Sequence, residues 1–143
     1  MIETLHNGSI SAGEIDHIAV AVPNLDQAIE MYKSKFGASV TDPIDVPEQG
    51  IRIAYAKFAN ACIEIMMPTR PDSPVGRFLD RNPKGGVHHF CLTTKNVDEA
   101  VQSAEANGMR LASKPIVGHH GRRLFFLHPA DTIGSLIEME EAD

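Results

Sequence analysis

The chain has 143 residues, 43% of them hydrophobic, and a formal net charge of −6 at pH 7. That length suits one domain with one core, or two tightly fused half-domains. The acidic balance argues against a nucleic-acid or anionic-membrane surface. No apolar run approaches the roughly 20 residues that a membrane span needs. We therefore expect neither a nucleic acid nor a membrane as a partner.

After a polar lead-in over residues 1–13, a strand and an amphipathic helix are predicted. Residues 14–22 read as a strand with two alternating faces. Asn24 is a good N-cap and Gln27 stands in the capping-box position. Apolar residues then recur at helical spacing as far as Phe36, and Gly37 is a typical stop. The pattern predicts a strand, a turn and a helix.

Three further strands complete a first β-α-β-β-β unit over residues 14–67. They are expected at 38–44, 51–58 and 61–67, with the loop 45–50 before the second and a tight turn at 59–60 before the third. Residues 68–84 are read as a linker with a short helix around 75–81.

The same plan recurs over residues 85–143. A strand is predicted at 87–94, then a helix at 97–107 with Asn96 as N-cap and Gly108 as stop. Short strands are expected at 109–112, 124–128 and 136–140, and a loop at 114–123.

An internal repeat relates the two units. His17 and His89 are 72 positions apart in matching segments, and Glu64 and Glu138 are 74 positions apart in another matching pair. Self-similarity of this kind indicates two copies of one structural unit. We predict an α+β fold in which two tandem β-α-β-β-β units form a curved mixed sheet around a metal-binding cavity.

Four polar residues occupy equivalent mid-strand positions: His17 and Glu64 in the first unit, His89 and Glu138 in the second. A carboxylate buried among apolar neighbours is costly unless it is paired or binds a metal. Two histidines and two carboxylates suit a divalent ion of the Mg, Mn, Co, Ni or Zn group, with positions left open for water or substrate. We predict that these four residues are metal ligands.

The other histidines, the cysteines and two arginines are not predicted to bind the metal. His88 adjoins His89, points to the opposite face and is interpreted as structural. Cys62 and Cys91 are expected to line the cavity as reduced thiols rather than to bind the ion. Loop or strand-end roles, on the surface or beside a substrate, are expected for His119, His120 and His128. Two roles stay open for Arg122 and Arg123: contact with an anionic substrate, or a place on a solvated face of the protein.

Paired units with this order of histidines and glutamates resemble the vicinal oxygen chelate superfamily, which includes glyoxalase I and extradiol dioxygenases. Within it, the chain resembles the methylmalonyl-CoA epimerase family from about Ile15 to its end. The segments that carry the resemblance are 15–20, 47–50, 72–74 with 78–79, 85–89 and 126–129. The strand histidines indicate only the superfamily, whereas Glu48-Gln49-Gly50 and the run 72–89 indicate the epimerases.

The resemblance implies a metal-dependent epimerase that interconverts (R)- and (S)-methylmalonyl-CoA through a metal-stabilised enolate. It places the metal at the four predicted ligands and proton transfer at Glu48 and Glu138. It also implies an acyl-CoA substrate and a homodimer. Two departures stand out: some members have Gln in place of Glu64, and residues 132–136 lack the usual Gly-Gly pair.

Two alternatives stay open. One is a glyoxalase I-type lactoylglutathione lyase, which also needs proton transfer beside a metal; the other is a non-catalytic small-molecule-binding protein of the same fold. A ring-cleaving dioxygenase is disfavoured by the fourth ligand and the short chain. The N-terminus shows no secretory signal and the two cysteines read as reduced, so we expect a cytoplasmic protein.

Overall fold

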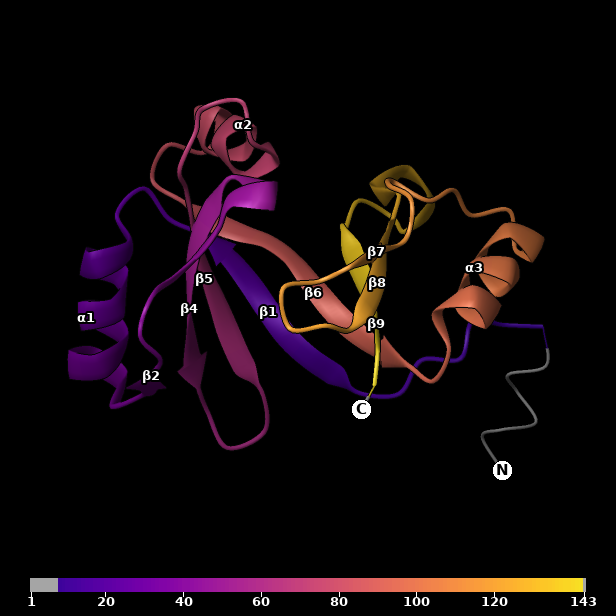
Figure 1. The fold of residues 1–143 in the computed structure, drawn as a ribbon, viewed down its shortest axis with the longest axis horizontal. Coiled ribbons are helices and arrows are strands. Elements are labelled where there is room, and N and C mark those ends of the chain that lie inside the picture. Colours follow the sequence, from indigo (N-terminus) through magenta and orange to yellow (C-terminus); the bar gives the residue numbers. More distant parts are fainter. Residues whose placement is uncertain (1–7, 143) are drawn as a thin grey trace. The chain divides into compact units, whose positions relative to one another are not determined.

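The computed structural model describes residues 8–142, and the chain divides into two compact units (Figure 1). The N-terminal unit is His17–His88, and the C-terminal unit is formed by residues 8–16 together with 89–142. The boundary falls inside two strands, β1 (Ile15–Ala21) and β6 (Gly86–Thr94). Each unit therefore has its own strands, helix and hydrophobic core.

In the N-terminal unit the strands follow the order β2-β4-β5-β1, with β3 also paired to β4. The β1–β5 pairing is parallel, and β2, β3 and β5 each pair antiparallel with β4. The bounds of the four further strands are β2 (Ser39–Val40), β3 (Ile44–Val46), β4 (Ile51–Lys57) and β5 (Cys62–Pro68).

The helix α1 (Leu25–Phe36) lies beside β2 and β4 (Figure 1). Its first turn is capped by Asn24, whose side chain accepts a hydrogen bond from the backbone N–H of Gln27. Gly37 ends it in the left-handed conformation that glycine adopts without strain. The buried face of α1 packs on one side of the sheet with Ala54, Ala56 and Ile65. The predicted helix and both of its ends are confirmed.

A second cluster covers the other face of the same sheet. It contains Ala19, Ala21 and Met66, and the ring of Phe78 packs against it from α2 (Pro74–Arg81). Ser73 caps α2 by accepting from the N–H of Gly76. His17 shares this face with the two alanines, because alternate residues of a strand point the same way.

In the C-terminal unit the order is β6-β9-β8-β7, with β6–β9 parallel and the other pairings antiparallel. The remaining bounds are β7 (Ile116–Val117), β8 (Arg123–Leu127), β9 (Ile137–Glu141) and α3 (Val97–Ala106). Asn96 caps α3 by accepting from the N–H of Glu99. The core joins Val97 and Ala104 of the helix to Phe125 and Met139 of the strands.

Three strand predictions differ from the structure. The predicted strand at 109–112 is reduced to an isolated bridge between Leu111 and Leu127. Ile116 and Val117 form β7 inside a predicted loop. The strand expected at 38–44 is two short strands, β2 and β3, of which β3 extends into the predicted loop 45–50. All three are short edge segments, where pairing rather than hydrophobic alternation decides the outcome.

The strand pairings repeat in the same register in both units. Ala19 stands opposite Glu64 in the N-terminal unit, and Cys91 stands opposite Glu138 in the C-terminal unit. The α+β class, with parallel and antiparallel pairings in each unit, is confirmed. Among residues 8–142, no helix is long and apolar enough to cross a membrane.

Candidate metal centre

The N-terminal unit contains a buried histidine–glutamate pair. Nε2 of His17 lies 3.5 Å from Oε1 of Glu64, and the two residues are 5% and 9% exposed. The parallel register explains the meeting: Glu64 stands opposite Ala19, and His17 lies two residues earlier on the same face of β1. The sequence thus places an imidazole beside a carboxylate within one sheet.

Tyr55, on the neighbouring strand, forms a hydrogen bond to this glutamate. Tyr55 stands opposite Glu64 in the β4–β5 pairing, and its hydroxyl donates to Oε2 of Glu64 over 3.4 Å. One carboxylate oxygen therefore faces Tyr55 while the other faces His17. A second partner of this kind orients a metal-binding carboxylate. Tyr55 was not among the predicted site residues, although its position opposite Glu64 is the signal that identifies it.

The C-terminal unit contains the equivalent pair at closer range. Nε2 of His89 lies 3.0 Å from Oε1 of Glu138, and each residue is 5% exposed. Phe126 stands opposite Glu138, where the other unit has Tyr55, and its ring packs edge-on against His89 with centroids 5.1 Å apart. Phe126 has no hydroxyl, so it cannot donate the hydrogen bond that Tyr55 gives to Glu64.

The donor atoms of each pair fit a divalent ion. An imidazole nitrogen and a carboxylate oxygen are the ligand types that Mg, Mn, Co, Ni and Zn accept. Without an ion, a ring N–H can lie between the two groups; a cation takes the place of that hydrogen, because a ligating imidazole nitrogen must be unprotonated. Burial of Glu64 and Glu138 in an otherwise apolar sheet is consistent with this use.

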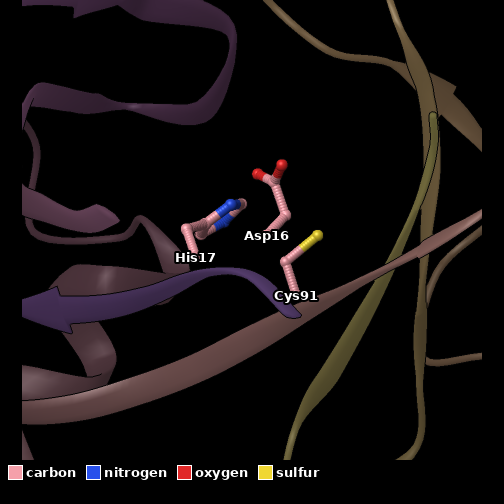
Figure 2. Close-up of side chains that lie close together, drawn as sticks. All are labelled: Asp16, His17 and Cys91. Atoms are coloured by element: carbon pink, nitrogen blue, oxygen red, sulfur yellow. The ribbon is translucent and has the colours of Figure 1, made fainter. Parts of the chain in front are cut away.

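Further side chains of ligand type lie beside Glu138 in the C-terminal unit. Cys91 of β6 stands directly opposite Glu138 in the parallel β6–β9 pairing. Ligand atoms of Cys91, Glu138 and Glu140 lie within 4.8 Å of one another, as do those of Cys91 and Asp16. Figure 2 shows Asp16 and Cys91 from their two strands, with His17 following Asp16 along β1. Both cysteines are free thiols.

Glu140 is the most deeply buried of these acids, with 1% of its surface exposed. One oxygen lies 2.6 Å from Nε2 of His120 and the other 3.2 Å from a guanidinium nitrogen of Arg122. Neither contact has the alignment of a hydrogen bond, so charge rather than directed bonding holds the group. Desolvation, followed by repulsion from Glu138, raises the pKa of the Glu140 carboxyl. Glu140 was not predicted as a site residue, although it lies on the same strand face as Glu138.

Glu48 is carried on a rigid turn in the N-terminal unit. Pro47–Gln49 form a single 3-10 turn, which Gly50 closes with a φ of 67°. The guanidinium of Arg70 donates to the carbonyl of Pro47 over 2.9 Å, and the N–H of Thr69 donates to the carbonyl of Gly50 over 2.7 Å. The Glu48 side chain is exposed at the tip of this turn.

The remaining predicted candidates have contacts with other residues. His88 packs edge-on against Phe78, with ring centroids 5.1 Å apart. Nδ1 of His128 accepts from the N–H of Ala130 and so caps a short turn. Arg123 pairs with Asp98 at 3.0 Å, whereas Arg122 contacts Glu140.

Comparison with known proteins places this arrangement in a family. Residues 16–126 match the Glyoxalase/Bleomycin resistance protein/Dioxygenase superfamily. A relative named "Methylmalonyl-CoA epimerase, mitochondrial" from Dictyostelium discoideum is 38% identical over 94% of this chain and 81% of its own length. The "Ethylmalonyl-CoA/methylmalonyl-CoA epimerase" of Cereibacter sphaeroides is 36% identical over 90% of this chain and 98% of its own.

Solved structures agree with these sequence relatives. The methylmalonyl-CoA epimerase of Mycobacterium tuberculosis superposes with a TM-score of 0.85 at 30% identity, over 94% of this chain and 91% of that one. A methylmalonyl-CoA epimerase in complex with methylmalonyl-CoA and NH4+ superposes with a TM-score of 0.84 at 34% identity, over 92% and 96%. The chain therefore belongs to the methylmalonyl-CoA epimerase family of the glyoxalase/bleomycin resistance/dioxygenase superfamily.

Proposed function

We propose that this protein is an isomerase that interconverts (R)- and (S)-methylmalonyl-CoA. The observation that carries the proposal is the pair of buried histidine–glutamate contacts, one in each unit, in a chain whose named relatives are epimerases of this substrate. The same relatives favour an epimerase over a glyoxalase I-type lyase or a non-catalytic binding protein.

His17, Glu64, His89 and Glu138 are the proposed ligands of one divalent metal ion, with Co, Mn, Mg, Ni and Zn as candidates. The repeat supports this assignment, because equivalent residues of the two units present the same two ligand types. When bound, such an ion offsets the negative charge that develops on the thioester oxygen as the α-proton leaves.

Glu48 and Glu138 are the proposed proton-transfer residues. The α-carbon between a thioester and a carboxylate carries a weakly acidic hydrogen. One residue, as a carboxylate, removes that proton, and the other, as a protonated carboxylic acid, returns a proton to the opposite face of the planar carbon, which inverts its configuration. Glu48 is suited to this role because its carboxylate is exposed on a turn held by Arg70. Glu138 is held by His89.

The test is hydrogen exchange at the α-carbon of methylmalonyl-CoA in heavy water, with and without a chelator. We expect the purified protein to incorporate deuterium and racemise the substrate, and we expect the chelator to abolish both. Isomerisation of the glutathione–methylglyoxal adduct without exchange into methylmalonyl-CoA would contradict the proposal. A protein without stoichiometric metal and without either activity would favour a binding role.

Assembly and location extend the proposal. We propose a homodimer, which light scattering on the purified protein tests directly. We also propose a cytoplasmic enzyme, which fractionation of the source cells tests.

A further inference from the structure

The turn that carries Glu48 has a structural counterpart in the C-terminal unit. Residues 47–50 follow Val46 of β3, and residues 118–121 follow Val117 of β7. The N–H of Gly50 donates to the carbonyl of Pro47 over 3.1 Å, and the N–H of Gly121 donates to the carbonyl of Gly118 over 2.9 Å. Both closing glycines have positive φ, 67° and 88°. The two segments are thus the same turn in the two repeats.

The strand register makes the correspondence residue-specific. Glu48 precedes Tyr55, the residue opposite Glu64, by seven positions; His119 precedes Phe126, the residue opposite Glu138, by the same seven. His119 therefore stands to the His89–Glu138 pair as Glu48 stands to the His17–Glu64 pair.

The C-terminal turn contacts a buried carboxylate, that of Glu140, at a position where the N-terminal unit has an apolar residue. Glu140 lies two residues after Glu138, where the other repeat has the apolar, buried Met66 two residues after Glu64. Glu140 contacts His120 and Arg122, which lie in and directly after the turn. Nδ1 of His120 also accepts from the N–H of Arg122 over 3.2 Å, so both of its ring nitrogens have partners. Glu140 of β9 therefore connects the turn to the sheet through two contacts.

This anchoring extends to His119. The rings of His119 and His120 lie with centroids 4.9 Å apart at an interplanar angle of 47°. His119 itself is exposed, as Glu48 is. The C-terminal turn thus carries the exposed imidazole of His119. Its ring contacts the ring of His120, which in turn contacts Glu140.

We propose that His119 contacts the substrate by donating a hydrogen bond to an oxygen of its malonyl-type acyl group, and that Glu140, through His120, positions it. This inference rests on the proposed function, since it takes a malonyl-type acyl-CoA as the substrate. A carboxylate such as Glu48 accepts protons but repels an anionic acyl group, whereas an imidazole donates an N–H to a carboxylate oxygen. The two equivalent turns then serve complementary tasks.

The test is calorimetric binding of malonyl-CoA and of acetyl-CoA, which lacks the carboxylate, to metal-loaded protein. For His119→Ala we expect about tenfold weaker binding of malonyl-CoA, the loss of one hydrogen bond to a charged group, and unchanged binding of acetyl-CoA. Val117→Ala, at an exposed position just before the turn, is the matched control and should change neither. Wild-type affinity of His119→Ala for malonyl-CoA would overturn the proposal.

The positioning role of Glu140 needs a separate variant. Glu140→Met introduces methionine, the residue that the N-terminal unit has at the equivalent position. The change removes the carboxylate and puts an apolar side chain of similar length in its place. We expect severalfold weaker binding of malonyl-CoA, and no further loss when His119→Ala is added, because both changes act through one contact. Additive losses would contradict the positioning role.

Failure of the proposed function has a different signature. A wild-type protein that exchanges no α-hydrogen but binds malonyl-CoA through His119 would refute the epimerase and retain the contact. A wild-type protein that binds malonyl-CoA no better than acetyl-CoA would refute the contact itself, whatever its activity.

Discussion

Nε2 of His89 and Oε1 of Glu138 lie 3.0 Å apart, both on residues that are 5% exposed. The equivalent atoms of His17 and Glu64 are 3.5 Å apart, and there Tyr55 provides a second contact to the glutamate. Glu138 is thus held by a shorter contact to its histidine than Glu64 is. Removing one partner of such a pair costs the buried group that contact.

Replacing His89 by alanine should remove both the metal and the activity. It should also lower the free energy of unfolding of the metal-free protein by about 1–3 kcal/mol, since Glu138 stays buried without its partner. Elemental analysis, the deuterium-exchange assay and urea unfolding measure the three effects. His88→Ala is the matched control, because its ring contacts Phe78 instead. Loss of metal in that control would mean that we assigned the wrong histidine.

Replacing Glu48 by glutamine should separate proton transfer from metal binding. The amide keeps the size of the side chain but cannot accept a proton, and Glu48 lies on the exposed 3-10 turn Pro47–Gln49 rather than on a strand. We expect metal content to be unchanged and epimerisation to fall by about 100-fold or more, the usual contribution of a general base. Near-normal turnover would remove Glu48 from the mechanism.

Tyr55→Phe should weaken metal binding without abolishing it. The hydroxyl contact to Glu64 is long at 3.4 Å, so we expect a loss of about tenfold, at the lower end for residues that orient a ligand. A competition titration with a metal-sensitive dye measures the affinity. The change makes the N-terminal unit resemble the C-terminal one, in which Phe126 holds this position. An unchanged affinity would show that Tyr55 does not orient Glu64.

Asp131→Asn should make the free energy of unfolding depend less on pH in the acid range. Two side-chain and one backbone N–H of Arg110 donate to the Asp131 carboxylate, and these bonds lower its pKa to about 2. A carboxyl whose folded pKa lies below its usual value of 3.8 adds stability above that value, and the stability is lost as the pH falls toward 2. Urea unfolding between pH 5 and 2 should show a shallower decline in the variant; solvent screening keeps the effect small.

The internal repeat and strand alternation were enough to predict that His17, Glu64, His89 and Glu138 lie at equivalent strand positions, and the capping residues predicted both long helices. Alternation assigns His17 and Glu64 each to one face of its strand, and α1 is capped by Asn24 and Gly37 as its sequence indicates. Alternation and capping are local signals, so one chain segment suffices to read them.

The contacts that were missed depend on partners far apart in sequence. Glu140 meets His120 because β9 pairs with β8, and neither segment alone indicates the partner. Tyr55 reaches Glu64 through the β4–β5 register, which the tight turn between them sets. The short strand β7 forms because β8 offers it an edge, a condition that its two residues do not encode.

Because of the shared register, with Ala19 opposite Glu64 and Cys91 opposite Glu138, the faces on which the proposed ligands lie depend on the number of residues in each strand. One residue inserted in β5 before Glu64 would turn that carboxylate to the opposite face, beside α1. The same insertion in the connection between β5 and α2 moves no ligand from its face. Natural length variation in this family should therefore gather in the connections and spare the ligand-bearing strands.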